Sequence, residues 1–136
     1  MNARAIVLTI LLCGAATRVG AAQQQIGPTP GPVRDTVPDR KNPFGKDPAA
    51  IREGRKLFGW YNCSGCHGEH AGGGMGPSLR DSTWIYGGTD ARIFASIAEG
   101  RTKGMPSWGH QLPVDQIWKL VAYIKSLRTP AEPDKP

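Results

Sequence analysis

Three stretches of this chain repeat apolar residues at intervals of three or four, the spacing of a helix that buries one face. They cover residues 47–62, 89–100 and 115–128. Glycine-rich loops separate them, and no segment alternates convincingly between apolar and polar residues as a half-buried strand would. The pattern predicts an all-α domain with three main helices and long loops.

Residues at the ends of these stretches are typical of helix boundaries. Asp47 is suited to cap the first helix, with Pro48 at its first helical position. Thr89 is expected to cap the second helix, which Gly100 should end. In the third helix one stripe is expected to be buried, and it comprises Ile117, Leu120, Val121, Ile124 and Leu127.

The first residues of the chain have the features of a secretory signal peptide. Arg4 precedes a short apolar run, and small residues up to Ala22 offer a cleavage site. The run is short for a bilayer span, although an uncleaved membrane anchor is the alternative. Cys13 follows Leu12 instead of the small residue of a lipoprotein signal, so we expect it to be removed. These features predict a signal peptide over residues 1–22 and a periplasmic protein without a transmembrane segment after cleavage.

The remaining chain is long enough for one domain with tails, since the whole sequence has 136 residues. Residues 23–43 are rich in proline and poor in apolar residues, which predicts an extended linker or a strap on a surface. Residues 44–128 are expected to form the folded domain, and residues 129–136 a second proline-rich tail. The apolar content is thin for three helices and such long loops, so the domain needs additional apolar core material.

The charge of the chain is mildly basic, with a formal net charge of +6. No basic cluster is interleaved with aromatic residues, so nucleic-acid binding is not expected. A basic protein favours encounter with an acidic partner surface. Lys56, Arg101 and Lys103 are expected to contribute to a positive rim for such a partner.

The sequence "CSGCH" carries the main chemical signal. Cys63, Cys66, His67 and His70 could be counted as zinc ligands, but Cys66 and His67 are adjacent and the rest of the chain after the signal peptide holds no second cysteine pair. A redox-active dithiol would require a strand that leads into a helix, which the pattern does not predict. Both alternatives fit the chain poorly.

Covalent attachment of haem fits better, because C-x-x-C-H is the signature of c-type haem attachment. On one helical turn Cys63 and Cys66 point to the same side, and the imidazole of His67 then points at the iron. Export agrees with this reading, since c-type haem is attached after export, and the porphyrin would supply the missing apolar core. We therefore predict one covalent haem c on Cys63 and Cys66, with His67 as an axial ligand of the iron.

The second axial ligand is expected to be a methionine, since His/Met ligation is the electron-transfer arrangement of haem iron. Met75 follows His67 closely and can hardly reach the opposite face of the haem. Met105 lies beyond a predicted helix, between Gly104 and Pro106, and is the expected ligand. His70 and His110 are expected to be surface residues, and His110 would compete only if Met105 were displaced.

The motifs "CSGCH", "GPSL" and "GMPSWG", in this order, resemble class I c-type cytochromes. The resemblance runs from about residue 47 to 128 and is strongest to small bacterial monohaem cytochromes and the cytochrome c subunits of cbb-type oxidases. It implies one haem enclosed by about three main helices and long loops. It also implies that the carbonyl of Pro77 accepts a hydrogen bond from His67, and that Gly54 lets the first helix cross the last closely.

The expected function is that of a periplasmic electron carrier, not an enzyme. It would pass single electrons from a redox donor to a terminal oxidase, a reductase or a dehydrogenase. One alternative is a haem-binding subunit of a larger redox complex. Another is a haem enzyme or gas sensor with an open iron position, for which only Arg101 and His110 flank the methionine loop.

Overall fold

The structure is a computed structural model, and it describes residues 37–133. The predicted signal peptide, the first part of the predicted linker and the last residues of the tail lie outside the described residues. No helix within residues 37–133 is both long and apolar enough to cross a membrane. The described part contains four helices, α1 (Pro48–Trp60), α2 (Cys63–His67), α3 (Asp90–Glu99) and α4 (Val114–Ser126).

The predicted boundary signals act as expected at α1 and α3. The Asp47 carboxylate accepts a hydrogen bond from the amide of Ala49 at 2.9 Å, and Pro48 opens the helix. The Thr89 hydroxyl caps α3 by accepting from the amide of Arg92 at 3.3 Å. Gly100 ends α3 with a φ of +71°, which favours glycine.

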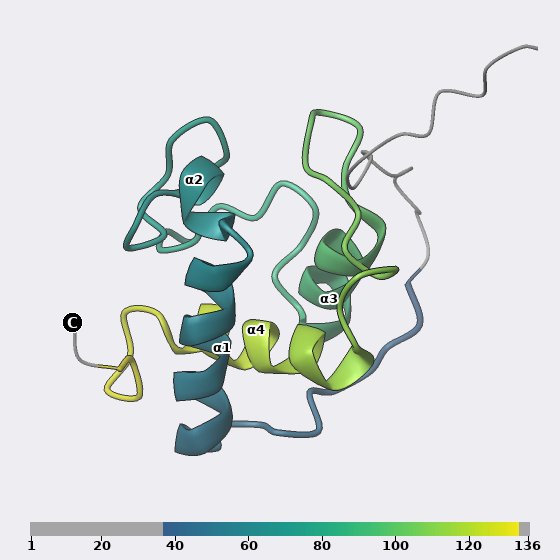
Figure 1. Ribbon diagram of the computed structural model, residues 1–136. Coiled ribbons are helices and arrows are strands. Elements are labelled where there is room, and N and C mark those ends of the chain that lie inside the picture. The colour runs from purple at the N-terminus through teal and green to yellow at the C-terminus, as the bar shows by residue number, and fades with distance from the viewer. Residues whose placement is uncertain (1–36, 134–136) are drawn as a thin grey trace, which may run out of the picture.

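The core lies mainly where α1 crosses α4, as Figure 1 shows. The rings of Phe58 and Tyr123 meet edge to face there, with centroids 5.5 Å apart. A Cβ at Gly54 would lie 2.0 Å from the backbone oxygen of Lys119, so the predicted close crossing at Gly54 is confirmed. The largest fully buried side chains are Ile51, Leu57, Ile117, Leu120 and Val121.

The segment before α1 is fastened to the other two long helices by Asn42. Its side-chain amide donates to the backbone oxygen of Trp118 in α4 at 2.8 Å, and its backbone amide donates to the Asp90 carboxylate at 2.9 Å. Its side-chain oxygen accepts from the amide of Phe44 at 3.0 Å. Figure 1 shows this segment running below α4 and away from α2. The end of the predicted strap is therefore part of the folded domain.

Replacing Asn42 with alanine is expected to lower the free energy of unfolding by about 1–2 kcal/mol, because two side-chain hydrogen bonds are lost. Chemical denaturation measures this difference. Lys41→Ala is the matched control, because Lys41 is exposed and adjacent in sequence. Equal stability of the two variants would show that Asn42 does not fasten the segment.

The chain after α4 folds back and contacts the loop that follows α2. The guanidinium of Arg80 donates to both carboxylate oxygens of Glu132, one of them at 3.1 Å, and Arg128 donates to the backbone oxygen of Arg80 at 2.9 Å. Both Arg80 and Glu132 are partly buried. Residues 129–133 therefore contact the domain, although the sequence predicts a separate tail from residue 129 onward.

Candidate functional site

The CxxCH motif forms the single turn of α2. Asn62 precedes the turn in the left-handed conformation, with a φ of +53°, which asparagine tolerates better than most residues. Cys63 and Cys66 form no disulfide, and both are partly buried. Burial raises the pKa of the Cys63 thiol to about 11. The turn thus presents two thiols three residues apart, with His67 directly after them.

The ring of His67 is oriented by the loop that follows it. Its Nδ1 atom lies 2.9 Å from the carbonyl oxygen of Pro77. A carbonyl can only accept, so Nδ1 carries the hydrogen and Nε2 keeps its lone pair for a metal. The hydrogen bond implied by the family resemblance is therefore present.

Gly76 is a site residue that the sequence analysis missed. A Cβ at this position would lie 2.9 Å from Cε1 and 3.0 Å from Nδ1 of the His67 ring. The ring cannot move aside freely, because the Pro77 carbonyl holds it. A glycine next to the predicted Pro77 was the available signal in the sequence.

Gly76→Ala is expected to lower the free energy of unfolding by about 1–3 kcal/mol, since the added methyl group overpacks the His67 ring. Gly72→Ala in the same loop is the control, because its Cβ would meet nothing within 4 Å. Thermal or chemical unfolding of the two haem-loaded variants measures the difference. Equal stability would mean that the ring of His67 has more room than the structure gives it.

Met105 lies in the chain after α3, at the end of a hairpin formed by Arg101–Met105. The amide of Arg101 donates to the backbone oxygen of Met105 at 2.8 Å, and the two residues form an antiparallel bridge. Met105 is partly buried and packs against the core, whereas Met75 is 88% exposed. The structure thus places Met105, and not Met75, among the side chains that border the apolar interior.

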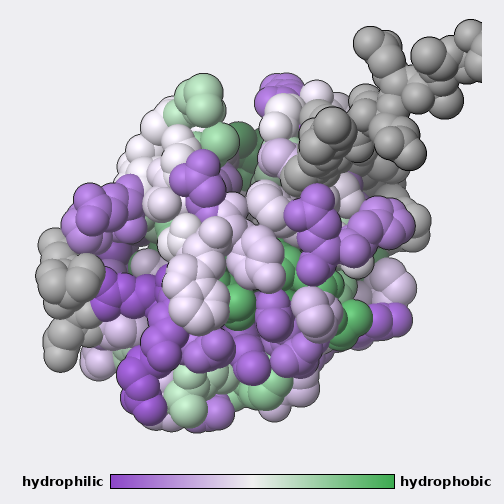
Figure 2. Space-filling model, viewed as in Figure 1, coloured by the Kyte–Doolittle hydropathy of each residue, from purple (hydrophilic) through white to green (hydrophobic). Residues whose placement is uncertain are grey.

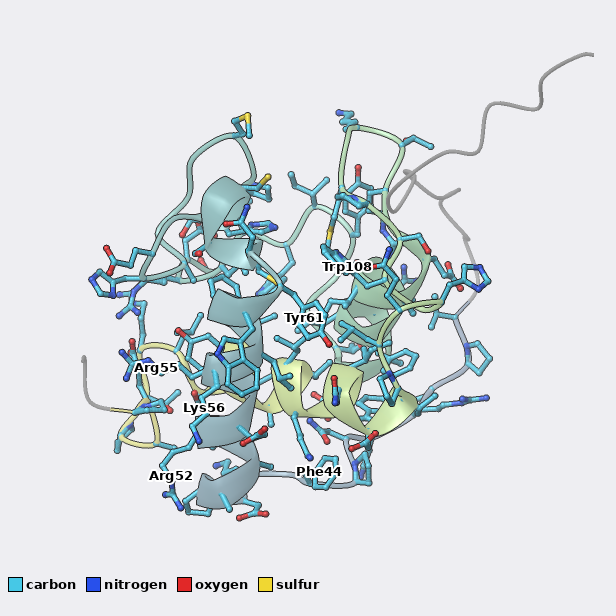
Figure 3. The ribbon with its side chains drawn as sticks, viewed as in Figure 1. Phe44, Arg52, Arg55, Lys56, Tyr61 and Trp108 are labelled. Atoms are coloured by element: carbon cyan, nitrogen blue, oxygen red, sulfur yellow. The ribbon has the colours of Figure 1, made fainter. Side chains whose placement is uncertain are left out.

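Apolar side chains that are only partly buried surround the space between these two loops. Figure 2 shows a recess at the top of the molecule, between α2 with its following loop and the hairpin, and apolar atoms are visible inside it. Tyr61 and Trp108 meet edge to face at 5.8 Å and join the end of α1 to the chain after the hairpin, as Figure 3 shows. Partly buried apolar residues that pack against the core include Tyr61, Cys63, Leu79, Trp84, Met105 and Trp108.

The structure removes one of the three residues expected to form a positive rim. Arg101 is only 4% exposed, so its assignment to the rim is wrong. Lys56 is exposed and lies 3.9 Å from Glu53, and Figure 3 places it on α1 with Arg52 and Arg55, below α2. Lys103 at the hairpin is exposed as predicted.

These residues fit a covalent haem group. Two thiols and an imidazole with a free Nε2 occupy one helical turn, and apolar side chains border the facing recess. The Nε atom of Arg101 is buried without a hydrogen-bond partner among the described residues, and such a donor would suit a haem carboxylate. No cluster of three or more histidine, cysteine or acidic residues suited to a metal ion occurs within residues 37–133, so the described part offers no support for the zinc reading.

The sequence of residues 49–124 matches the family described as "Cytochrome C oxidase, cbb3-type, subunit III". The chain belongs to this family. Its members are class I c-type cytochromes, so membership confirms the predicted all-α fold and the haem c cofactor. It also agrees with the electron-transfer cytochrome that the sequence predicted.

Two kinds of relative are similar to the chain. Cytochrome c-L of Methylorubrum extorquens is 31% identical over 131 residues, which cover 95% of this chain and 66% of the relative. The cbb3-type cytochrome c oxidase subunit FixP of Sinorhizobium medicae is 37% identical over 62% of this chain, but over only 32% of the relative. The chain therefore matches part of each relative.

Solved structures agree with this assignment. The crystal structure of cytochrome cL from Methylophaga aminisulfidivorans is 35% identical, with a TM-score of 0.60 over 63% of this chain and 60% of that one. Cytochrome cL from Hyphomicrobium denitrificans gives a TM-score of 0.57 at 34% identity, over 61% of this chain and 50% of that one. Residues 37–133 contain four helices and no strand, which matches this all-α fold.

Proposed function

We propose that this protein is an exported monohaem cytochrome c that carries single electrons between redox proteins in the periplasm. Cys63 and Cys66 would hold the haem through thioethers, and His67 and Met105 would be the axial ligands. Haem c supplies a one-electron ferric–ferrous couple when it is bound. The observation that carries the proposal is the hydrogen bond between Nδ1 of His67, in the CxxCH turn, and the Pro77 carbonyl in the loop that follows.

The chain's own residues would set the properties of such a carrier. The Pro77 carbonyl fixes the tautomer of His67 and raises its basicity as a ligand. A methionine thioether as the opposite ligand would raise the reduction potential. The apolar side chains around the recess would keep water away from the cofactor and so tune the same potential.

Periplasmic location rests on the signal-like residues 1–22, which lie outside the described residues. The partner would be a redox protein, and the mild positive charge of the chain favours one with an acidic docking surface. Rates of electron transfer to such a partner would fall as salt is added, because screening shortens the reach of exposed charges. Equal rates at low and high salt would argue against an acidic docking surface.

A second candidate is a haem-binding subunit of a larger redox complex. The similarity to FixP, which is named as a subunit of an oxidase, favours it. Gel filtration of a native periplasmic extract with haem staining separates the two possibilities. Haem that elutes at the size of this chain supports the carrier, and haem that elutes with a much larger assembly supports the subunit.

The third possibility, an open-iron haem enzyme or gas sensor, is tested by spectroscopy. Ferric haem with a methionine ligand shows a weak near-infrared charge-transfer band that an open site lacks. We expect the purified protein to show this band. Its absence would count against Met105 ligation and favour the open-iron alternative.

A further inference from the structure

The most unusual charged residue in the described part of the chain is Arg101. Only 4% of its surface is exposed. Arginine is rarely buried to this extent unless its charge is paired or hydrogen-bonded. Lys103 is exposed in the same hairpin, so the burial of Arg101 is specific to that side chain. A buried guanidinium in a short surface hairpin therefore calls for a structural reason.

The guanidinium of Arg101 holds the end of α3. Its Nη1 atom donates to the backbone oxygen of Gly100 at 2.7 Å and to that of Ala95 at 3.2 Å. Gly100 directly follows the C-terminus of α3, where carbonyls lack helical partners and carry partial negative charge, so a cation is a favourable partner there. The same guanidinium lies 5.1 Å from the centre of the Tyr86 ring and 3.9 Å from the carboxylate of Glu99. The side chain is thus held by the end of α3 and by Tyr86, which precedes that helix.

The backbone of Arg101 holds Met105. Its amide donates to the Met105 oxygen at 2.8 Å, and its carbonyl accepts from the amide of Gly104 at 3.1 Å. A Cβ at Gly100 would lie 2.6 Å from that Met105 oxygen, so the two strands of the hairpin meet closely at its base. One residue therefore joins the methionine to the helix before it, through its backbone on one side and its side chain on the other.

The chain after Met105 has its own anchors. The hydroxyl of Ser107 donates to the Ala98 oxygen at 2.8 Å, and the amide of Trp108 donates to the Ile97 oxygen at 3.0 Å. These contacts do not involve the Arg101 side chain. Loss of that side chain should therefore loosen the hairpin and leave the following segment in place.

We infer that Arg101 is a positioning residue that keeps Met105 in place as the axial ligand of the haem iron. The inference rests on the proposed function, since it takes Met105 as that ligand. Arg101 acts by closing the hairpin against α3 and does not itself touch the iron. An external ligand must displace the thioether, so its apparent affinity rises with the fraction of molecules in which the hairpin is open.

The test measures imidazole binding to the ferric, haem-loaded protein at neutral pH and constant ionic strength. Arg101→Gln removes the charge-assisted hydrogen bonds to α3, and we expect imidazole affinity to rise by about 10- to 100-fold, with a weaker near-infrared methionine band. In Arg101→Lys the imidazole affinity should rise less than in Arg101→Gln. The ammonium group of lysine keeps the charge but lacks the planar, forked geometry of the guanidinium. Haem should remain attached in both variants.

Two controls separate positioning from charge and from general stability. Lys103→Gln removes the same charge from the same hairpin at an exposed position, and its affinity should stay within about twofold of the wild type. Asn42→Ala lowers stability at the opposite end of the domain and should leave imidazole affinity unchanged. If either control matches Arg101→Gln, the effect comes from charge or from stability, and the inference is overturned.

The outcomes also separate this inference from the proposed function. One outcome would overturn the inference and leave Met105 ligation standing. In it, Arg101→Gln binds imidazole with the affinity of the wild type, and Met105→Ala binds imidazole tightly. Wild-type affinity in Met105→Ala would instead overturn the proposed ligand. If the Arg101→Gln protein does not accumulate, the Arg101→Lys variant is used in its place. An imidazole affinity equal to that of the wild type in that variant overturns the inference.

Discussion

Replacing Met105 with alanine is expected to open the sixth coordination position of the haem iron while the haem stays attached. Cys63, Cys66 and His67 are unchanged in this variant, so the thioethers and the first axial ligand remain. Imidazole, cyanide or azide should then bind far more readily, and the near-infrared band should disappear. The reduction potential should fall by at least on the order of 0.1 V, because axial ligands set haem potentials over a range of about 0.8 V and a thioether raises them.

Met75→Ala is the control for this experiment. Met75 is 88% exposed in the loop after α2, so its loss should change neither the spectrum nor the potential. If Met75→Ala opened the iron and Met105→Ala did not, the ligand assignment would be reversed. If neither did, His110 would become the candidate ligand, and the carrier proposal would weaken.

Replacing Gly54 with alanine is expected to destabilise the protein by about 3 kcal/mol, the upper end of the usual cost of overpacking. The added Cβ would lie 2.0 Å from the backbone oxygen of Lys119 and 2.9 Å from the Cβ of Tyr123. Neither atom belongs to the flexible end of a side chain, so α1 and α4 must separate. This cost exceeds the gain in helix propensity of about 1 kcal/mol that alanine brings.

Gly59→Ala provides a control with the opposite sign. Gly59 also lies in α1, but it is exposed and its Cβ would meet nothing within 4 Å. The same substitution should therefore stabilise the protein by about 0.5–1 kcal/mol. Denaturant titrations of both variants give the two values, and a stable Gly54→Ala variant would show that the helices cross less closely than the structure indicates.

Local signals in the sequence predicted the helices well. Asp47 and Thr89 cap their helices through their own side chains, and Gly100 ends α3 with a positive φ. These effects depend on neighbouring residues in the chain, so the local pattern is enough to find them. The CxxCH motif is also local, because one helical turn brings both cysteines and the histidine together.

Contacts between distant residues could not be predicted in the same way. Arg101 was expected on an exposed rim because charged side chains usually face water, but carbonyls at the end of α3 draw it inside. Glu132 lies in a stretch that reads as a polar tail, and its ion pair with Arg80 depends on how the folded chain returns. Only the family resemblance supplied the long-range contacts at Gly54 and Pro77, since no local pattern specifies them.

The anchoring of Asn42 determines how the domain would sit if it were tethered by its N-terminal segment. Anything attached there enters the fold where Asn42 meets α3 and α4, through Asp90 and Trp118. Figure 1 shows the described part of this segment running along one side of the molecule and then below α4 to the start of α1. A fusion partner or an electrode surface joined through this segment would therefore pull on contacts with α3 and α4, and not on the loops that carry His67 and Met105.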